Sequence, residues 1–342
     1  MRSMFVGSRA AGLTGALLVV VLGAWVGAAQ TRPLRLFSTA WPPFTNEVGQ
    51  PRFALDLVEA AFARFNQPST TTIVPPGQFT TTLLAGEYDG SAAAWRDAER
   101  ERVLLYSDPY LENRLVLVGR KGADVSATAL SALAGRRIAL VEGYSYGPEV
   151  DNSGPTFVRA RSEEDCVAQL LGGKVDYVLM DDLVVQYIAD NHAREAQAKL
   201  QLGTRPLVTR PLYLVIKRSH PDARGIIDRF NAQLRGMIAD RTYHRLLHVD
   251  WIQADVDGDG LFEYIPGNDT KGVSEPTRAY SIFSEKEPAP AAPAVAESTQ
   301  PRFYVGGNIY RDWASVPSNY KAAGNMPPPP SRATASLFRF AW

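Results

Sequence analysis

The sequence predicts an α/β fold made of two lobes, and three observations lead to this prediction. Between residues 32 and 250, apolar or β-branched runs alternate with stretches whose apolar residues recur at helical spacing, which is typical of parallel sheets covered by helices. Two extended segments, 115–119 and 211–216, join two such alternating runs. Apolar residues make up 45% of the 342 residues, enough for a sizeable core. We therefore expect a double crossover between the lobes and a cleft beside it.

The first alternating run predicts three strands separated by two helices. Its first strand stops at the Trp-Pro-Pro-Phe sequence of residues 41–44, where two prolines exclude a helix. Leu55, Val58 and Phe62 then recur every three or four residues and indicate a helix with one buried face. In chain order we expect strand 34–38, helix 55–65, strand 70–74, helix 79–84 and strand 89–94.

The second run follows the first extended segment and alternates in the same way. Ser162 is expected to cap a helix whose first turn holds three acidic residues, 163–165, because acids there interact favourably with the helix dipole. Two glycines at 172–173 end this helix. After strand 115–119 we expect strand 138–141, helix 162–171, strand 175–180, helix 182–191, strand 212–216 and a helix around 226–234.

The first 29 residues differ from the rest and predict an export signal. Arg2 and Arg9 precede an apolar stretch, 10–29, that ends in Gly27-Ala28-Ala29. A basic start, an apolar centre and small residues at the end are typical of a cleaved signal peptide. An uncleaved membrane anchor is the alternative, because about 18 apolar residues can span a bilayer. We expect cleavage near Ala29 and a periplasmic protein.

Charge and cysteine content exclude some classes of function. The chain has 36 basic and 36 acidic residues and a formal net charge of zero, so it lacks the positive field that draws proteins to nucleic acid. Cys166 is the only cysteine, which rules out an internal disulfide, and its place in a helical stretch predicts a small core residue.

The chain changes character after Trp251. Residues 252–285 read as an acidic loop or extension, and 286–342 as a mostly disordered tail, because 287–299 consists mainly of Ala, Pro and Glu. The last six residues, 337–342, are apolar apart from one arginine. An added strand or a peptide that docks on a partner are the alternatives for this end.

Six short segments occur in a fixed order between residues 32 and 251. They are 40–44 (Ala-Trp-Pro-Pro-Phe), 88–90 (Tyr-Asp-Gly), 99–110 with its Tyr-Ser-Asp-Pro-Tyr end, 133–137 (Leu-Ala-Gly-Arg-Arg), 175–181 (Val-Asp-Tyr-Val-Leu-Met-Asp) and 231–251. Each is a weak signal alone, but the ordered set resembles family 3 of the extracellular solute-binding proteins, the polar-amino-acid receptors of ABC importers.

This resemblance implies a fold, a domain division and a class of function. The fold is the two-lobed periplasmic binding protein fold of type II, with residues 30–118 and 211–251 in lobe 1 and 119–210 in lobe 2. The implied function is non-enzymatic: the protein binds a small polar solute, first of all an amino acid, and passes it to an ABC permease in the inner membrane.

The resemblance also implies the polar residues of the site. A ligand carboxylate requires a bidentate cation, and Arg100 matches the family's arginine; a solvated arginine in a charged run is the alternative. Asp181 matches the aspartate that takes the ligand's ammonium, and it follows a strand at the sheet edge where α/β folds bind ligands. Ser145, next to Tyr144, matches a hydroxyl that meets the carboxylate. Helix capping is the alternative for Asp181 and Ser145.

Aromatic residues are expected to form the wall of the cleft. Trp41 matches the family's aromatic wall, with Phe44 and Phe79 near it. One departure concerns residues 92–96, which read Ala-Ala-Ala-Trp-Arg where the family usually has hydroxyl side chains. Trp95 therefore adds an aromatic ring where hydroxyls are lost, which widens the expected ligand from an amino acid to other small polar solutes.

An aspartate-rich segment, 255–260, is a separate signal. Asp255, Asp257 and Asp259 with a following glycine are spaced as in a calcium loop, and Glu263 could be a late ligand. Pro266 stands where an EF-hand requires glutamate, which excludes a standard EF-hand. An acidic surface turn is the alternative, and no other cofactor is expected.

Two further functions compete with solute delivery. Periplasmic dehydratases related to the family show that this cleft can gain an acid/base pair, for which Glu142 or Asp181 would be candidates. A sensor or scaffold is the other alternative, in which residues 286–342 would dock a partner.

Overall fold

The computed structural model describes residues 1, 32–247, 251–254, 256, 259, 261–267, 272–275, 280–281 and 302–322. Residues 1–32 and 33–342 form two units, and the fold described below belongs to the second. The predicted signal peptide, 1–29, lies outside the described residues except for Met1. Within the described ranges, no helix has the length and apolar character needed to cross a bilayer.

One nine-stranded sheet runs through both lobes, in the order β2-β1-β3-β9-β5-β8-β6-β7, with β4 paired to β9. The strands are β1 (Leu34–Thr39), β2 (Ser69–Val74), β3 (Gly90–Trp95), β4 (Leu104–Tyr106), β5 (Leu111–Arg120), β6 (Arg137–Val141), β7 (Thr156–Ala160), β8 (Tyr177–Asp181) and β9 (Leu200–Lys217). Strands β1, β2 and β3 are parallel, and so are β6, β7 and β8. The antiparallel pair β5 and β9 joins these two parallel groups.

The two joining strands are longer than the sequence predicted. β9 begins at Leu200 rather than near Pro211. Its first half was not predicted because it contains Gly203 and Pro206, which disfavour a strand. The β5–β9 pairing accommodates them through shifts of register around Val116, which pairs with Pro206. The β7 strand was also not predicted.

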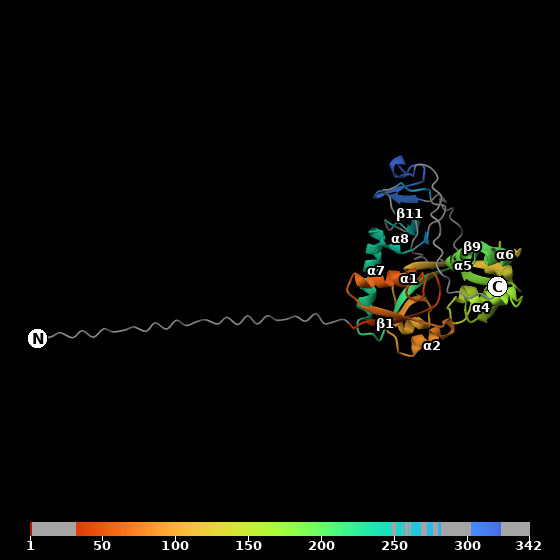
Figure 1. Ribbon diagram of the computed structural model, residues 1–342, viewed down its shortest axis with the longest axis horizontal. Coiled ribbons are helices and arrows are strands. Elements are labelled where there is room, and N and C mark those ends of the chain that lie inside the picture. Colours follow the sequence, from red (N-terminus) through yellow and green to blue (C-terminus); the bar gives the residue numbers. More distant parts are fainter. Residues whose placement is uncertain are drawn as a thin grey trace. The chain divides into compact units, whose positions relative to one another are not determined.

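In the first lobe, α1 (Phe53–Ala63) and α7 (Ala223–Ala239) lie against the strands of the sheet (Figure 1). This lobe also contains α2 (Phe79–Leu84) and α8 (Thr242–Leu247), with short 3₁₀ turns η1 (Pro76–Gln78) and η2 (Arg100–Arg102). In α1 the residues Leu55, Val58 and Phe62 are buried as expected. Phe62 meets Phe230 of α7 with ring centroids 6.1 Å apart, so the two helices pack against each other.

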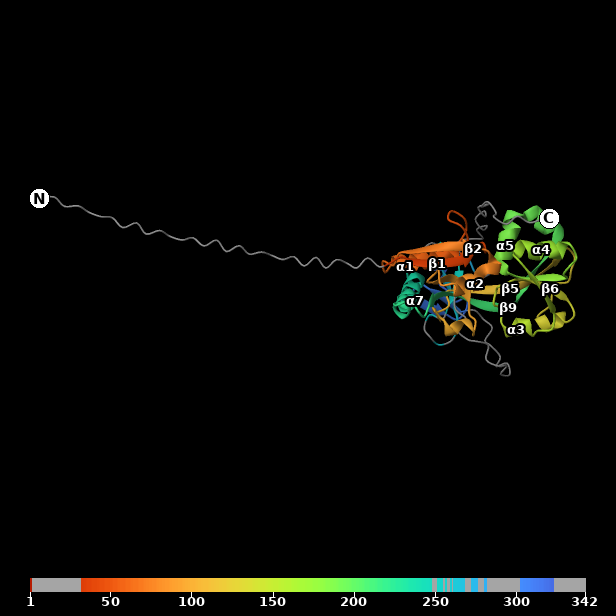
Figure 2. The same cartoon turned by 90° about the horizontal axis from the view of Figure 1, so that it is seen from below.

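Helices of the second lobe lie on both faces of its strands (Figure 2). They are α3 (Pro148–Asp151), α4 (Glu163–Leu171), α5 (Asp182–Asn191) and α6 (Ala193–Lys199), with η3 (Leu130–Leu133). Ser162 caps α4 as predicted, because its hydroxyl accepts a hydrogen bond from the Asp165 amide at 3.3 Å. Cys166 is buried in the core, also as predicted.

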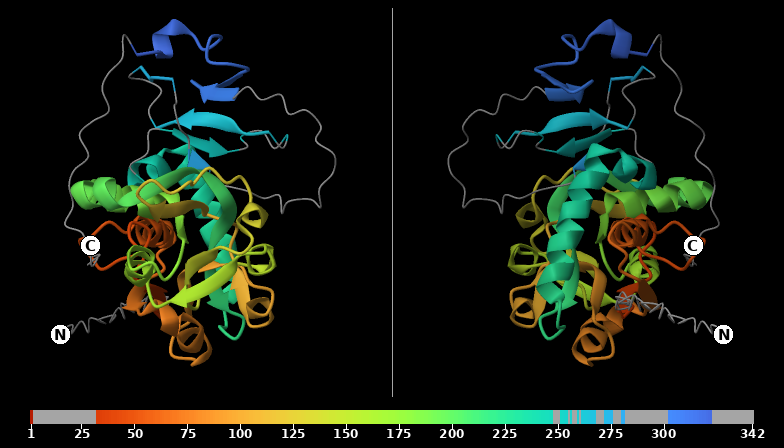
Figure 3. Two further views of the ribbon diagram at one scale, coloured as in Figure 1. Left: turned by 90° about the vertical axis from the view of Figure 1, so that its right-hand side faces the viewer. Right: turned by 90° about the vertical axis from the view of Figure 1, so that its left-hand side faces the viewer.

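A second sheet, which the sequence did not predict, follows the last helix (Figure 3). Its strands run in the order β12-β10-β11-β13-β14. They are β10 (Trp251–Ala254), β11 (Glu263–Pro266), β12 (Tyr280–Ser281), β13 (Arg302–Val305) and β14 (Asn308–Tyr310), and η4 (Ser318–Tyr320) follows them.

The predicted disordered tail is therefore wrong for residues 302–322. Phe303 and Trp313 pack on Trp251, with ring centroids 6.1 and 5.9 Å from the Trp251 ring, and Val305 is fully buried beside them. These apolar side chains outweigh the surrounding Ala/Pro/Glu composition because they bury against a strand that precedes the tail. The other residues of 286–342 lie outside the described ranges.

Candidate ligand-binding site

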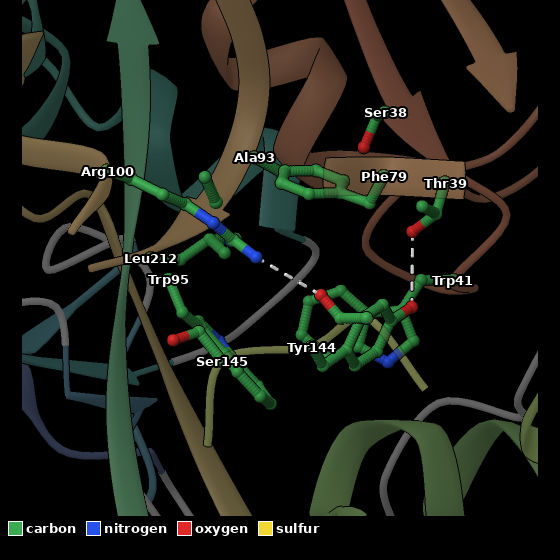
Figure 4. Close-up of a pocket in the computed structure, with 12 residues that line it drawn as sticks. Ser38, Thr39, Trp41, Phe79, Ala93, Trp95, Arg100, Tyr144, Ser145 and Leu212 are labelled. Atoms are coloured by element: carbon green, nitrogen blue, oxygen red, sulfur yellow. Dashed lines mark hydrogen bonds between the residues drawn. The ribbon is translucent and has the colours of Figure 1, made fainter. Parts of the chain in front are cut away.

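A cavity of about 30 Å³, called here the outer cavity, opens where the two lobes meet (Figure 4). Lobe 1 contributes the ends of β1 and β3, Trp41, α2 and Arg100, and lobe 2 contributes the loop after β6. Six of the predicted ligand residues line it: Trp41, Phe79, Trp95, Arg100, Tyr144 and Ser145. The space suits about two water molecules, so an amino acid enters only if the lobes or the lining side chains move.

Arg100 supplies the cation of the outer cavity. Its Nη2 donates to Thr80 Oγ1 at 2.8 Å and, across the lobes, to the Gly143 carbonyl at 3.4 Å. The guanidinium carbon lies 5.3 Å from the centre of the Phe79 ring. Among the described residues no carboxylate lies within ion-pair distance of this guanidinium. Neutral groups thus hold a cation at the cavity and leave it able to pair with an anion.

Three aromatic rings, those of Trp41, Trp95 and Tyr144, form the inner wall of the outer cavity, and Tyr146 packs against Trp95. The ring of Trp95 lies 5.6 Å from Trp41, 5.6 Å from Tyr144 and 5.2 Å from Tyr146, each edge-on. Trp95 Nε1 donates to Asn113 Oδ1 at 2.7 Å, and the hydroxyls of Thr39 and Tyr144 are 3.1 Å apart across the lobes. Phe44 lines neither cavity described here. It is fully buried behind Trp41, with the ring centroids 4.5 Å apart, so it supports the wall rather than facing the cleft.

Ser145 is held by an acid that the sequence did not single out. Its hydroxyl donates to Asp97 Oδ2 at 2.5 Å, and Asp97 Oδ1 accepts from the Arg100 amide at 3.0 Å. Burial alone would raise the pKa of Asp97, but the hydrogen bonds from Ser145 and Arg100 outweigh it and lower the pKa. Gly147, not Ser145, occupies the capping position of α3, so the capping alternative does not apply to this serine.

A second, smaller cavity of about 10 Å³ lies on the other side of the aromatic wall and is called here the inner cavity. It shares Trp41, Trp95 and Tyr144 with the outer cavity. Apart from Leu115 of β5, its other lining comes from lobe 2 and includes Tyr146 and two acids, Glu163 and Asp181. Arg100 and Asp181, the predicted polar ends of the site, therefore face different cavities.

Asp181 caps α5, the alternative that the sequence left open. Its Oδ1 accepts from the Leu183 amide at 2.8 Å, and its Oδ2 accepts from the Arg114 amide at 3.0 Å. The side chain is 2% exposed. Burial, with the nearby Asp182 charge, raises the pKa of Asp181 to about 8. Both oxygens are thus committed to backbone amides, although the residue also borders the inner cavity.

Glu142, the other acid considered for catalysis, is exposed and lines neither cavity. Of these two candidates for an acid/base group, only Asp181 therefore borders a cavity described here.

The proposed calcium loop is described only in part, because Asp255 and Asp257 lie outside the described residues. Asp259 Oδ2 pairs with Arg302 Nη1 at 2.6 Å, and Arg302 Nε lies 2.9 Å from Glu263 Oε1. Glu263 is fully buried. A guanidinium thus lies between two of the four predicted metal ligands, so a salt bridge balances their charge where a calcium ion was predicted. Calcium binding stays a prediction.

Three solved structures are similar to this chain in fold. One is an ancestral arginine-binding protein bound to arginine, with 21% identity and a TM-score of 0.54; the match covers 64% of this chain and 98% of that one. Another is the GluR0 ligand-binding core from Nostoc punctiforme in complex with L-glutamate, with 19% identity and a TM-score of 0.52; the match covers 63% of this chain and 97% of that one. A third is a histidine kinase sensor domain with similarity to periplasmic binding proteins, with 17% identity and a TM-score of 0.55; the match covers 64% of this chain and 96% of that one.

No curated protein matches the chain. Residues 36–254 match the family described as bacterial extracellular solute-binding proteins, family 3. This match, with the structural similarities, confirms the predicted resemblance and the two-lobed fold. The chain belongs to family 3 of the bacterial extracellular solute-binding proteins.

Proposed function

We propose that this protein captures a small zwitterionic solute, an amino acid or a close relative, in the periplasm and delivers it to an ABC importer. The observation that carries the proposal is Arg100. It holds a cation at the cavity between the lobes, fixed by Thr80 and Gly143 and without an ion-pair partner among the described residues. A carboxylate is the anion that a guanidinium binds in two parallel hydrogen bonds.

Contacts across the lobes support capture by closure. Tyr144 meets Thr39, and Ser145 donates to Asp97, so residues of lobe 2 contact lobe 1 at the rim of the outer cavity. Opening about β5 and β9 would break these contacts and expose Arg100 to solvent. Two of the similar structures are bound to arginine and to L-glutamate, which agrees with an amino acid as the first candidate.

The test compares Arg100→Ala with wild type in a thermal-shift screen of amino acids, followed by calorimetry on those that bind. Arg96→Ala is the matched control, because Arg96 pairs with Glu101 and lines neither cavity. We expect Arg100→Ala to weaken binding about 10- to 100-fold through loss of charged hydrogen bonds, and Arg96→Ala to bind as wild type does. Equal affinities for wild type and Arg100→Ala would refute the assignment.

A sensor function is the second candidate. It is favoured by the similarity to a histidine kinase sensor domain and by the extra sheet after α8, which a simple binding protein does not need. Cross-linking in living cells, with a photoreactive residue at exposed Leu261, separates the two. Cross-links from this residue to a signalling protein that form only when solute is present would favour the sensor, and cross-links to a permease would favour delivery.

A further inference from the structure

The inner cavity contains a buried acid whose charge nothing in the described structure balances. Glu163 is the first residue of α4, and its side chain is 3% exposed. Its Oε2 atom is fully buried and has no hydrogen-bond partner among the residues that the structure describes. Buried carboxyl groups are almost always paired, because an unsatisfied one loses its hydration without replacement. A glutamate in this state therefore needs an explanation beyond the stability of the fold.

Two arginines that contact lining residues of the inner cavity pair with other acids. Arg159 stacks on the Tyr146 ring at 5.6 Å and pairs with Asp151, while Arg114 pairs with Asp182. Asp181 shares the inner cavity, but both its oxygens accept from backbone amides. Glu163 is thus the acid of this cavity that keeps a free acceptor. Its place at the start of α4 favours a negative charge there, because the helix dipole is positive at that end.

The lining of the inner cavity suits a cation in other ways. Tyr144 and Tyr146 border it together with Glu163, and aromatic ring faces attract ammonium and guanidinium groups. Burial raises the pKa of Glu163 to about 8, which is the expected state of an acid that lacks its cation.

The two cavities are separated by side chains rather than by backbone. Trp41, Trp95 and Tyr144 line both, and Tyr144 is held in place on the lobe 1 side by its contact with the Thr39 hydroxyl. Rotation of Tyr144 as the lobes open would join the cavities into one site. Such a site has Arg100 at one end, Glu163 at the other and aromatic rings between them.

We propose that Glu163 is a ligand-binding residue that accepts hydrogen bonds from a cationic group of the solute in the inner cavity. The solute is then a zwitterion whose anionic group pairs with Arg100 and whose ammonium or guanidinium group lies beyond the Trp41–Trp95–Tyr144 wall. This inference rests on the proposed function, because it assumes that Arg100 receives the anion.

The test uses probe pairs that differ only in the cationic group. L-lysine is compared with L-norleucine, L-arginine with L-citrulline, and 5-aminovalerate with valerate, on the full mature chain by calorimetry. The variants are Glu163→Gln, which keeps the shape of the side chain, and Glu164→Gln as the matched control on the same helix turn. Thermal melting of each variant shows that it is folded.

We expect wild type and Glu164→Gln to prefer the cationic member of at least one pair by about tenfold or more, which equals about 1.4 kcal/mol. Glu163→Gln should abolish this preference while still binding the neutral member. If wild type binds both members of every pair equally, or if Glu163→Gln keeps the preference, the inference fails and the proposed function stands. If wild type binds none of the six probes, both fail. A change in melting temperature with unchanged preference would mark Glu163 as purely structural.

Discussion

The outer and inner cavities share a wall of aromatic rings but hold charge in opposite ways. In the outer cavity Arg100 is half-buried and bonded to neutral oxygens of Thr80 and Gly143. In the inner cavity Glu163 and Asp181 are 3% and 2% exposed, and burial raises the pKa of each to about 8. The outer cavity thus has a guanidinium bonded to neutral groups, whereas the inner cavity has two acids that bind their protons more tightly than usual.

This difference teaches what each cavity can contribute to binding. A preformed guanidinium attracts an anion from solution without a further change of state. A protonated acid attracts no cation at a distance, and it must lose its proton when the cation binds. The outer cavity therefore suits first capture, and the inner cavity suits discrimination once the lobes have begun to close.

The largest expected effect comes from removing the two capping bonds of Asp181. Asp181→Ala leaves the buried amides of Leu183 and Arg114 without an acceptor, so we expect the free energy of unfolding at pH 7 to fall by about 3 kcal/mol. Asp181→Asn keeps one carbonyl acceptor and should lose about half as much. Urea titrations measure both. Arg100→Ala should leave stability nearly unchanged, so a wild-type midpoint for Asp181→Ala would show that the inner cavity does not depend on this cap.

Much of the fold could be predicted because its signals are local. The apolar stripe of α1, the Ser162 cap and the alternation of strands and helices each depend on neighbouring residues only. The first half of β9 could not be predicted, since Pro206 is tolerated there only through a register shift against β5. The second sheet depends on contacts between Trp251 and Phe303, residues far apart in the chain, and composition alone does not encode such contacts.

The site shows the same division. Arg100, Trp41 and Ser145 could be predicted because they lie in short recognisable segments. Glu163 was missed because an acid at the start of a helix is ordinarily a solvated, dipole-stabilising residue. A signal was present, however: Glu163 is in line with Cys166, Val167 and Leu170 at helical spacing, on the face of α4 that is buried. Only tertiary packing decides that this face borders a cavity.

The second effect is the pH dependence that Glu163 gives to stability. Its pKa is about 8 in the folded chain and about 4.3 when unfolded, so the folded state binds the proton more tightly. Its contribution is therefore fully present below about pH 4 and is lost as pH rises toward 8. Glu163→Gln should remove this loss.

Urea titrations of the ligand-free protein at pH 5, 6.5 and 8 measure the slope, with Glu164→Gln as the control that keeps it. A Glu163→Gln protein whose stability falls with pH as steeply as wild type would mean that Glu163 is not a buried, uncompensated acid. Asp181 would then be the only buried acid that distinguishes the inner cavity from the outer one in this comparison.

The smallest effect belongs to the rim of the outer cavity, where Ser145 donates to Asp97. This hydrogen bond helps to lower the pKa of Asp97 in the folded protein. The stability that the bond contributes is therefore fully present above the pKa of the unfolded chain, about 3.9, and is lost as pH falls through the lower pKa of the folded protein. Ser145→Ala should cost about 1 kcal/mol or less at pH 7, because Asp97 is partly solvated, and less still at pH 3. Ser153→Ala, which removes a hydrogen bond to the neutral Val150 carbonyl, should show a loss that does not change with pH. If the loss of stability depends on pH in the same way for both variants, Asp97 is not a charged acceptor for Ser145. Arg100 is then the only charged residue assigned to the outer cavity.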